Sequence, residues 1–385
     1  MAETPRAARQ GQVFVTNEST YGTAATQTAT DAVRHTEFSA SANPYNRVNS
    51  PEKKQSPGVV NRFDRRGTAS WSLKSLLRPS GTLNTLCEAN KLLKAGFGAE
   101  SNITLSTTVV ASPAPTTTSC TVASAAGLVK GQAILITVSA VKYVRFLTNV
   151  ATAALTWAPA LPGAPVEGAA VKGCVTYGVT SALALPLSLA HYSGADAVLS
   201  RIVKGAVVDT LGIAFGHNGE PVVSFAGPAK SVTTPAPTKP VAFTAVGTQN
   251  PPSGLTGGLY VGSALYRFED LDIQIANGLE LDMDNYGSAD AYGILPRHTQ
   301  AITLGLNAKA LDESVIYDNA ESGTPVAIMK QTGFTEGNIV GIYAPLVDFD
   351  VPDRDDGDTI PKWAFKGVCK ESSDSMNDAL YLALA

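Results

Sequence analysis

The 385-residue chain is poor in the residues that build metal sites and disulfide frameworks, having only 4 cysteines and 4 histidines. None of the cysteines stands in CxxC spacing, which predicts free thiols and neither a zinc site nor a disulfide framework. Only Cys120 and Cys174, which flank one small segment, remain a candidate pair. The chain also lacks an apolar run of about 18 residues and the apolar stretch of a signal peptide. A membrane-spanning or secreted product is therefore not expected.

The usual signatures of catalysis are missing as well. The histidines lie far apart, outside any HExxH or HxH pattern, and the sequence has no GxSxG, P-loop or GxGxxG motif. DxD begins at Asp270, Asp282 and Asp348, each time inside strict alternation of polar and apolar residues. A strand explains that alternation more simply than a metal site does. We therefore predict no enzyme, no cofactor and no metal.

What the chain does contain is typical of a mainly β protein. Thr, Val, Ala, Gly and Pro are abundant, and short alternating runs recur between Gly, Pro and Asn. A single flanking α-helix is predicted over residues 82–95, where Leu83, Leu86 and Leu93 fall at helical spacing. Gly96 follows as the expected helix stop. Further along, DTLGIAF and PVVSF predict a β-hairpin that turns at Asn218-Gly219.

The chain divides into a discontinuous main domain and a small inserted one. Residues 106–175 read as a separate β module, which is bounded on one side by SPAPTTTS and includes the alternating run around Ile134–Val138. Because chains tolerate insertions at exposed loops, we expect this module on the outer surface. The main domain then comprises residues 1–105 and 176–385.

Negative charge is concentrated in one segment. Residues 267–360 hold 5 basic and 18 acidic residues, a net charge of −13, in a chain whose total is −4. The segment includes LELDMDNYGSADAYG, which looks like a calcium loop from Asp282 onward. An EF-hand loop needs an oxygen ligand at position 5 and a glutamate at position 12, where this chain has Tyr286 and Gly293. A calcium site is therefore not predicted.

Alternation instead predicts a β-hairpin with one acidic face. A three-residue loop ending in Gly278 would pair Ile273 with Leu281 and set Asp272 against Asp282. Opposed like charges destabilise a hairpin, which leaves three explanations: a solvated face, a metal site, or a surface that is required to be negative. The polar face comprises Asp270, Asp272, Gln274, Glu280, Asp282 and Asp284.

The N-terminal region has a different character. Residues 12–45 form a polar arm rich in small residues, and a loop rich in Pro and charge follows it. Neither stretch can bury a core by itself, so the arm is expected to lie on another surface.

The order of these features resembles the tail tube (major tail) proteins of long-tailed bacteriophages. The resemblance rests on ESTYGTAAT, on the helix ending LLKAGFG, and on the run GAVVDTLGIAFGHNGEPVVSFAGPAK. It continues through LDIQIANGLELDMDNYGSADAYGILPRHTQAITLGLNA to GFTEGNIVGIYAPLVDFDVP and DGDTIPKWAFKGV. It covers residues 12–100 and about 176–385, and the inserted module resembles those that decorate some of these proteins.

The resemblance implies a tail-tube-like β-sandwich or barrel that forms hexameric rings, which stack into a hollow tube conducting DNA to the host. It implies a virion tail protein assembled in the host cytoplasm, with the tape measure, tail terminator and tail-tip proteins as further partners and only transient, non-specific DNA passage. Within that family the acidic face is a candidate lumen surface, because carboxylates repel phosphates. The arm is a candidate inter-ring contact through Glu18, Tyr21, Thr23, Thr26 and Val33.

Three alternatives remain at this stage. An adhesin or carbohydrate-binding sandwich would share the β composition but stay monomeric. A polysaccharide-degrading enzyme would need two carboxylates about 5 to 10 Å apart in a cleft. A tail-tip or baseplate protein would share the tail-tube fold.

Overall fold

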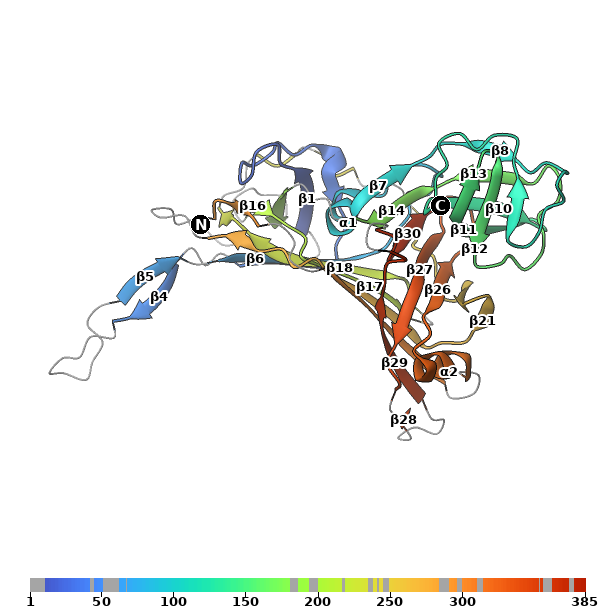
Figure 1. Cartoon of the computed structure of the whole chain (residues 1–385). Coiled ribbons are helices and arrows are strands. Elements are labelled where there is room, and N and C mark those ends of the chain that lie inside the picture. Colours follow the sequence, from blue (N-terminus) through green and yellow to red (C-terminus); the bar gives the residue numbers. More distant parts are fainter. Residues whose placement is uncertain are drawn as a thin grey trace.

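The computed structural model shows a mainly β protein, as the sequence predicts (Figure 1). It describes residues 11–41, 45–50, 62–66, 68–180, 186–193, 200–216, 219–234, 238–240, 242–244, 249–283, 291–295, 300–309, 314–352, 354–355, 362–373 and 377–385. Within these residues the strands form sheets of 15, 6, 5, 2 and 2 members.

One long sheet organises the molecule. Its path runs β21 (Ala264–Tyr266), β20 (Gly257–Val261), β26 (Val326–Thr332), β27 (Val340–Phe349), β29 (Lys362–Cys369), β25 (Ala301–Lys309), β22 (Asp270–Ala276), β17 (Thr210–Gly216), β18 (Val222–Ala229), β6 (Ala69–Leu76) and β3 (Glu37–Ser41). Off this path, β28 (Arg354–Asp355) pairs with β29, and β30 (Tyr381–Leu384) pairs with β27 and β14 (Val175–Val179), which in turn pairs with β7 (Gly98–Asn102). The predicted pairing of DTLGIAF with PVVSF is confirmed by β17 and β18, while turn residue Asn218 lies outside the described residues.

A second, five-stranded sheet covers one face of the long sheet. Its order is β19 (Ser231–Thr233), β16 (Ser200–Ala206), β15 (Leu187–Ser193), β1 (Gly11–Asn17) and β2 (Ala32–Val33), with a short 3-10 turn, η2 (Ala29–Asp31), before β2. Val13 and Val15 of this sheet share a core with Trp71 and Leu73 of the long sheet. Alternation in each strand supplies the buried side chains, so the two sheets pack as a sandwich.

Residues 106–173 build a sheet of their own. The order is β8 (Ser106–Thr108), β13 (Ala170–Gly173), β10 (Ala133–Val138), β11 (Val141–Ala151), β12 (Ala154–Ala158) and β9 (Ser119–Thr121). A bridge between Val109 and Val122 joins the two outer strands, so this sheet closes on itself around a separate apolar cluster that includes Trp157. We call it the small barrel. The chain enters it after β7 and leaves it into β14, and these two strands pair with each other.

The small barrel is tightly packed against the long sheet. Val144 and Phe146 of β11 share an apolar cluster with Met329 and Tyr343. Arg145, fully buried at this junction, donates to the carbonyls of Val144 (2.7 Å) and Ala160 (3.2 Å) and lies over the rings of Tyr143 and Tyr260. The ammonium groups of Lys142 (2.5 Å) and Lys172 (2.8 Å) both contact the carboxylate of Glu336. These contacts fix the small barrel relative to the main sandwich.

The helix prediction needs two changes. Helix α1 spans Asn90–Phe97 and begins eight residues later than predicted, since residues 82–89 form turns in which Asn84 has a φ of 60°. A left-handed residue cannot belong to a right-handed helix. Gly96 lies inside the helix, and Gly98, with a φ of 101°, ends it. The sequence pattern also missed a second helix, α2 (Ser314–Ser322), which packs beside β27.

The polar arm packs within its own subunit. Residues 11–17 and 32–33 are strands β1 and β2, so Val33 is buried in the main core. The Glu18 carboxylate is also buried and accepts hydrogen bonds from Ser188 Oγ (2.6 Å) and the Gly22 and Gly205 amides (2.6 and 2.8 Å). The arm therefore needs no second surface to bury its apolar side chains. Glu18 and Val33 are not free to form an inter-ring contact, although Thr23 and Thr26 are exposed.

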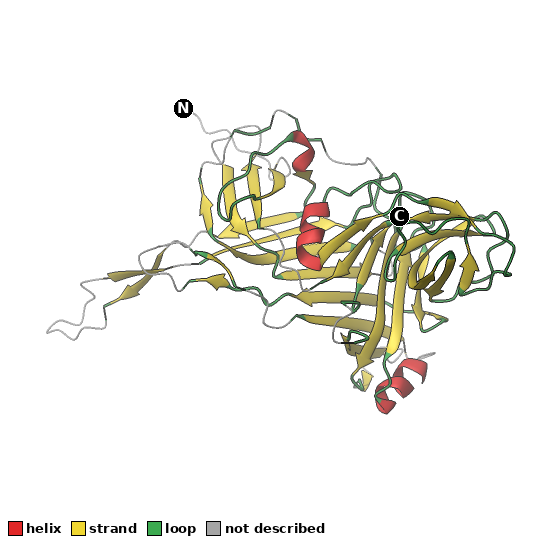
Figure 2. Cartoon of the chain, turned by 45° about the horizontal axis from the view of Figure 1, so that its top comes forward, coloured by secondary structure: helices red, strands yellow, loops and turns green. Residues whose placement is uncertain are grey.

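Two paired strands, and not the arm, project from the rest of the molecule. Strands β4 (Tyr45–Asn49) and β5 (Arg62–Arg66) pair only with each other among the described strands. Both views show them projecting away from the rest of the chain (Figures 1 and 2). Phe63, which lies opposite Val48, is 45% exposed. We call residues 45–66 the projecting hairpin.

All four cysteines are buried as free thiols, so Cys120 and Cys174 are not paired. Burial raises the thiol pKa of Cys120 to about 11 and those of Cys87 and Cys369 to about 12. Because the thiolate is the reactive form, we expect a disulfide reagent at pH 8 to label no cysteine in the native protein and all four after denaturation. Rapid labelling of the native chain would contradict this burial.

Candidate functional surface

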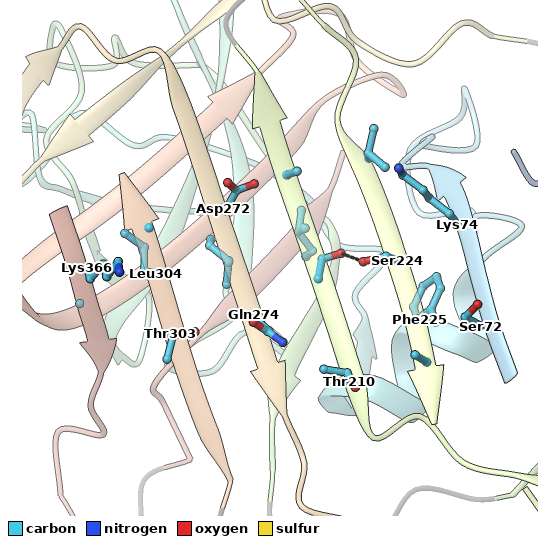
Figure 3. Close-up of a pocket in the computed structure, with 18 of the residues that line it drawn as sticks. Ser72, Lys74, Thr210, Ser224, Phe225, Asp272, Gln274, Thr303, Leu304 and Lys366 are labelled. Atoms are coloured by element: carbon cyan, nitrogen blue, oxygen red, sulfur yellow. Dashed lines mark hydrogen bonds between the residues drawn. The ribbon is translucent and has the colours of Figure 1, made fainter. Parts of the chain in front are cut away.

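The long sheet has one buried face and one open face. In β22 the side chains of Leu271, Ile273 and Ile275 are buried, whereas Asp272 and Gln274 are exposed. The same period-2 pattern in the neighbouring strands brings small or polar residues to the open face, as the sticks in Figure 3 show. The residues on this face, here called the open face, include Glu37, Ser72, Lys74, Thr210, Gly212, Ala214, Val222, Ser224, Ala226, Asp272, Gln274, Thr303, Gly305, Lys366 and Val368.

Strand register aligns these side chains in rows. One row crosses seven strands, and its members are Glu37, Lys74, Ser224, Gly212, Gln274, Thr303 and Val368. A parallel row places Ala214, Asp272, Gly305 and Lys366 side by side. Since most members are small, the face forms a shallow trough of about 900 Å³.

The open face carries charges of both signs. Glu37, Asp272 and Asp350 line the trough together with Lys74 and Lys366. Figure 3 places the two lysines on strands at opposite sides of the trough, with Asp272 between them. Burial, and to a lesser extent the nearby Asp270 carboxylate, raise the pKa of Asp272. The result is a weakly negative surface without a cluster of cations.

The predicted acidic hairpin does not form. Both edges of β22 are already paired, with β17 on one side and β25 on the other, so Asp272 lies opposite Ala214 and Gly305 rather than Asp282. Strand β23 (Leu281–Asp282) pairs instead with β24 (Gly293–Ile294), and Asp284 lies outside the described residues. Of the six predicted face residues, Asp270, Asp272 and Gln274 share the open face of β22. Glu280 and Asp282 lie on the segment that follows β22, outside the long sheet.

Asn277 explains why the chain does not turn back. Gly278 does take a left-handed φ of 61°, as predicted, but the Asn277 side chain before it is fully buried. Its Nδ2 donates to the carbonyls of Gly96 (3.0 Å) and Val208 (2.9 Å), and its Oδ1 accepts from Gln300 (2.7 Å). These bonds tie the end of β22 to the end of α1 and direct the chain away from β22.

Replacing Asn277 with Ala should therefore destabilise the subunit. The change leaves two buried carbonyls and one amide without their partner, and each buried unsatisfied group costs about 1–3 kcal/mol. We expect a loss of about 3 kcal/mol in the free energy of unfolding, measured by urea denaturation. Ser224→Ala, on the open face, is the matched control and should change stability by less than about 0.5 kcal/mol. Equal stabilities of the two variants would contradict the role given to Asn277.

Alternation found the open face of β22 but missed the other strands that complete the surface. Ser72 and Lys74 come from a strand that the sequence indicates, ASWSLKSL, and Thr303 and Gly305 come from AITLGLNAK. The period-2 pattern was visible in both segments. The sequence did not show which strands would become neighbours, because the pairs join residues far apart along the chain.

Comparison with known families decides the class of protein. Residues 8–361 match the sequence model of the phage tail tube protein family. The chain belongs to this family. It is a structural protein of the phage tail whose copies assemble into the tail tube. A comparison with curated proteins gave no match.

Two further observations concern the described part of this tail tube protein. None of its helices is long and apolar enough to cross a membrane. No group of three or more His, Cys, Asp or Glu side chains in the described residues could hold a metal ion. The tail tube family is a structural one.

Proposed function

We propose that the protein forms hexameric rings that stack into the tail tube, with the open face of the long sheet lining the channel through which DNA leaves the virion. The open face carries this proposal. Its other side is the main core, whereas the trough side carries small and polar side chains and is uncovered among the described residues. A wall rich in Lys and Arg would bind phosphates and slow the DNA, and this face has few cations. Asp270, Asp272 and Gln274 are the proposed lumen residues.

Ring closure follows from the two ends of the long sheet. Strand β21 ends the sheet on one side and β3 on the other, so each exposes backbone groups that a neighbour can pair with. Pairing of one copy's β21 with the next copy's β3 is a head-to-tail contact, which generates a ring when the rotation closes. A continuous sheet around the channel is the proposed outcome.

Ring stacking is assigned to the projecting hairpin. A two-stranded hairpin is marginally stable in water by itself, and this one exposes Phe63, so a partner surface would stabilise it. Residues 45–66 hold 6 basic and 2 acidic residues, which complements the acidic segment 267–360 of another copy. The hairpin thus replaces the arm as the proposed inter-ring contact.

The inserted domain and the partner proteins are assigned positions relative to this tube. Residues 106–175 are the proposed inserted domain, on the outside wall, and residues 1–105 and 176–385 the tube domain. A decorated outer wall fits a tail without a contractile sheath. The tape measure, tail terminator and tail-tip proteins are the proposed partners, DNA passes without specific binding, and assembly occurs in the host cytoplasm. We propose no enzymatic activity.

Negative-stain electron microscopy of the purified protein over a range of concentrations tests this function. Hollow rods with a regular axial repeat are expected above a critical concentration. Single particles at every concentration, both alone and with tail-tip protein added as a nucleus, would instead favour a monomeric binding module.

A further inference from the structure

Lys330 occupies an unusual position in the long sheet. In β26 it shares a face with Val326 and Ile328, which belong to the main core, and its cross-strand partners are Leu259 and Ile342. The residue is 3% exposed. Lysine is rarely buried to this extent unless its ammonium group is paired.

No carboxylate in the part of the chain that the structure describes pairs with this ammonium group. Among the described residues Lys330 forms no hydrogen bond or ion pair, and its one polar contact is with the face of the Phe268 ring, 4.7 Å from the Nζ atom. Burial lowers the pKa of Lys330 to about 8. Other partly buried lysines do have partners, such as Lys91 with Asp31 and Lys142 with Glu336. An unpaired charge in this place destabilises the isolated subunit.

The side chain borders a pocket that opens at the free edge of the sheet. The pocket has a volume of about 700 Å³ and is lined by Lys330, Arg267 and Phe268, with Leu265 of β21 at its rim. Leu265 is 68% exposed. The pocket therefore combines two cations with an exposed apolar residue, next to the strand that has no further neighbour among the described residues. Such a combination suits a partner that brings a carboxylate and covers apolar surface.

We propose that this pocket receives an acidic side chain from a second copy of the chain, which pairs with Lys330 when subunits join at the β21 edge. The inference rests on the proposed ring assembly and names one of its contacts. The two cations of the pocket favour a carboxylate, and the partner is a second copy because copies of this chain assemble with one another. Pairing across the interface would compensate the buried charge that the isolated subunit leaves unsatisfied.

Zero-length carbodiimide cross-linking tests the contact directly, because it joins an amine to a carboxylate only when the two touch. Tubes built from a mixture of ¹⁴N- and ¹⁵N-labelled chains should give cross-linked peptides in which Lys330 of one isotope is joined to an Asp or Glu of the other. The same reaction on dilute, unassembled subunits should give no such product. Tubes that form without any Lys330 cross-link between copies would overturn the proposal.

Substitutions separate docking from a structural role. Lys330→Met fills the same space without a charge, so it should raise the Tm of the subunit by about 2–4 °C. It should also raise the critical concentration for assembly by at least about 30-fold, since the partner carboxylate is left unpaired. Lys94→Met, on the exposed side of α1, is the control and should alter neither. Normal assembly of Lys330→Met would also overturn the proposal.

The pH dependence gives an independent readout. Lys330 is protonated below about pH 8 in the free subunit, so the critical concentration should be constant there and rise above that pH. Lys330→Arg stays charged and should show a flatter profile. The other charged or titratable side chains at the pocket are Arg267 and Tyr266, which both variants retain.

The outcomes distinguish this contact from the ring assembly. A wild-type chain that never polymerises would refute the ring assembly itself, whereas polymerisation that is unaffected by substitution of Lys330 refutes only this contact.

Discussion

Removing the projecting hairpin should abolish tube formation while the rest of the subunit stays folded. Strands β3 and β6 pair at Ser41 and Ser70, so replacing residues 43–67 with a short Gly- and Asn-containing turn leaves the sheet intact. Loss of this contact should raise the critical concentration more than about 100-fold, which corresponds to about 3 kcal/mol. Sedimentation and negative-stain microscopy measure the polymer, and thermal unfolding checks the fold.

Two matched variants make the hairpin result specific. Phe63→Ala removes the exposed aromatic side chain alone and should weaken assembly by about tenfold, a fraction of the effect of the deletion. Thr26→Ala, on the exposed part of the arm, should have no effect. Because the proposed contact is between opposite charges, raising the salt from about 0.1 to 1 M should also weaken it. Tubes of normal length from the hairpin-deleted chain would show that ring stacking depends on other residues.

Adding lysines to the open face should turn a passive channel wall into a DNA-binding one. Ser72, Ser224 and Thr303 are exposed there, and Lys tolerates such a strand position. A triple Ser72→Lys, Ser224→Lys, Thr303→Lys variant should still assemble, but its tubes should retain single DNA molecules in the channel. Retention should fall sharply between about 50 and 200 mM salt, because it depends on displaced counterions. Phages that carry the variant should lose infectivity by more than about 100-fold.

The control places the same charges elsewhere. Thr118→Lys, Ala123→Lys and Ala126→Lys add three lysines to exposed positions on the small barrel. If the small barrel lies outside the tube, these changes should leave ejection and infectivity near wild-type levels. Equal losses from both triple variants would mean that the open face is not the wall past which DNA moves.

Local sequence patterns predicted which side of a strand is buried, but they did not predict which strands pair with each other. Alternation identified the buried and open sides of β22 correctly, since it depends only on the period of a strand. It could not show that β22 is a central strand, because β17 and β25 come from segments about 60 residues before and 30 residues after it. Helix periodicity over residues 82–95 was likewise overridden by the left-handed turn at Asn84. Short-range signals were reliable where tertiary packing agreed with them.

The same distinction applies to the candidate surface. Sequence reasoning found Asp270, Asp272 and Gln274 but joined them to Glu280 and Asp282, because the nearest acidic run was assumed to be the cross-strand partner. The buried hydrogen bonds of Asn277 determine where the chain goes instead. A buried asparagine cannot be told from an exposed turn asparagine by residue type, so this feature needed the structure.

Helical reconstruction of the assembled tube by electron cryomicroscopy is the most direct test of the account. It predicts that the open face of β17, β22 and β25, marked by Asp272, Gln274 and Thr303, points toward the tube axis. The small barrel should lie on the outside. A reconstruction in which this face points outward, or is buried in a contact between subunits, would contradict the proposed channel.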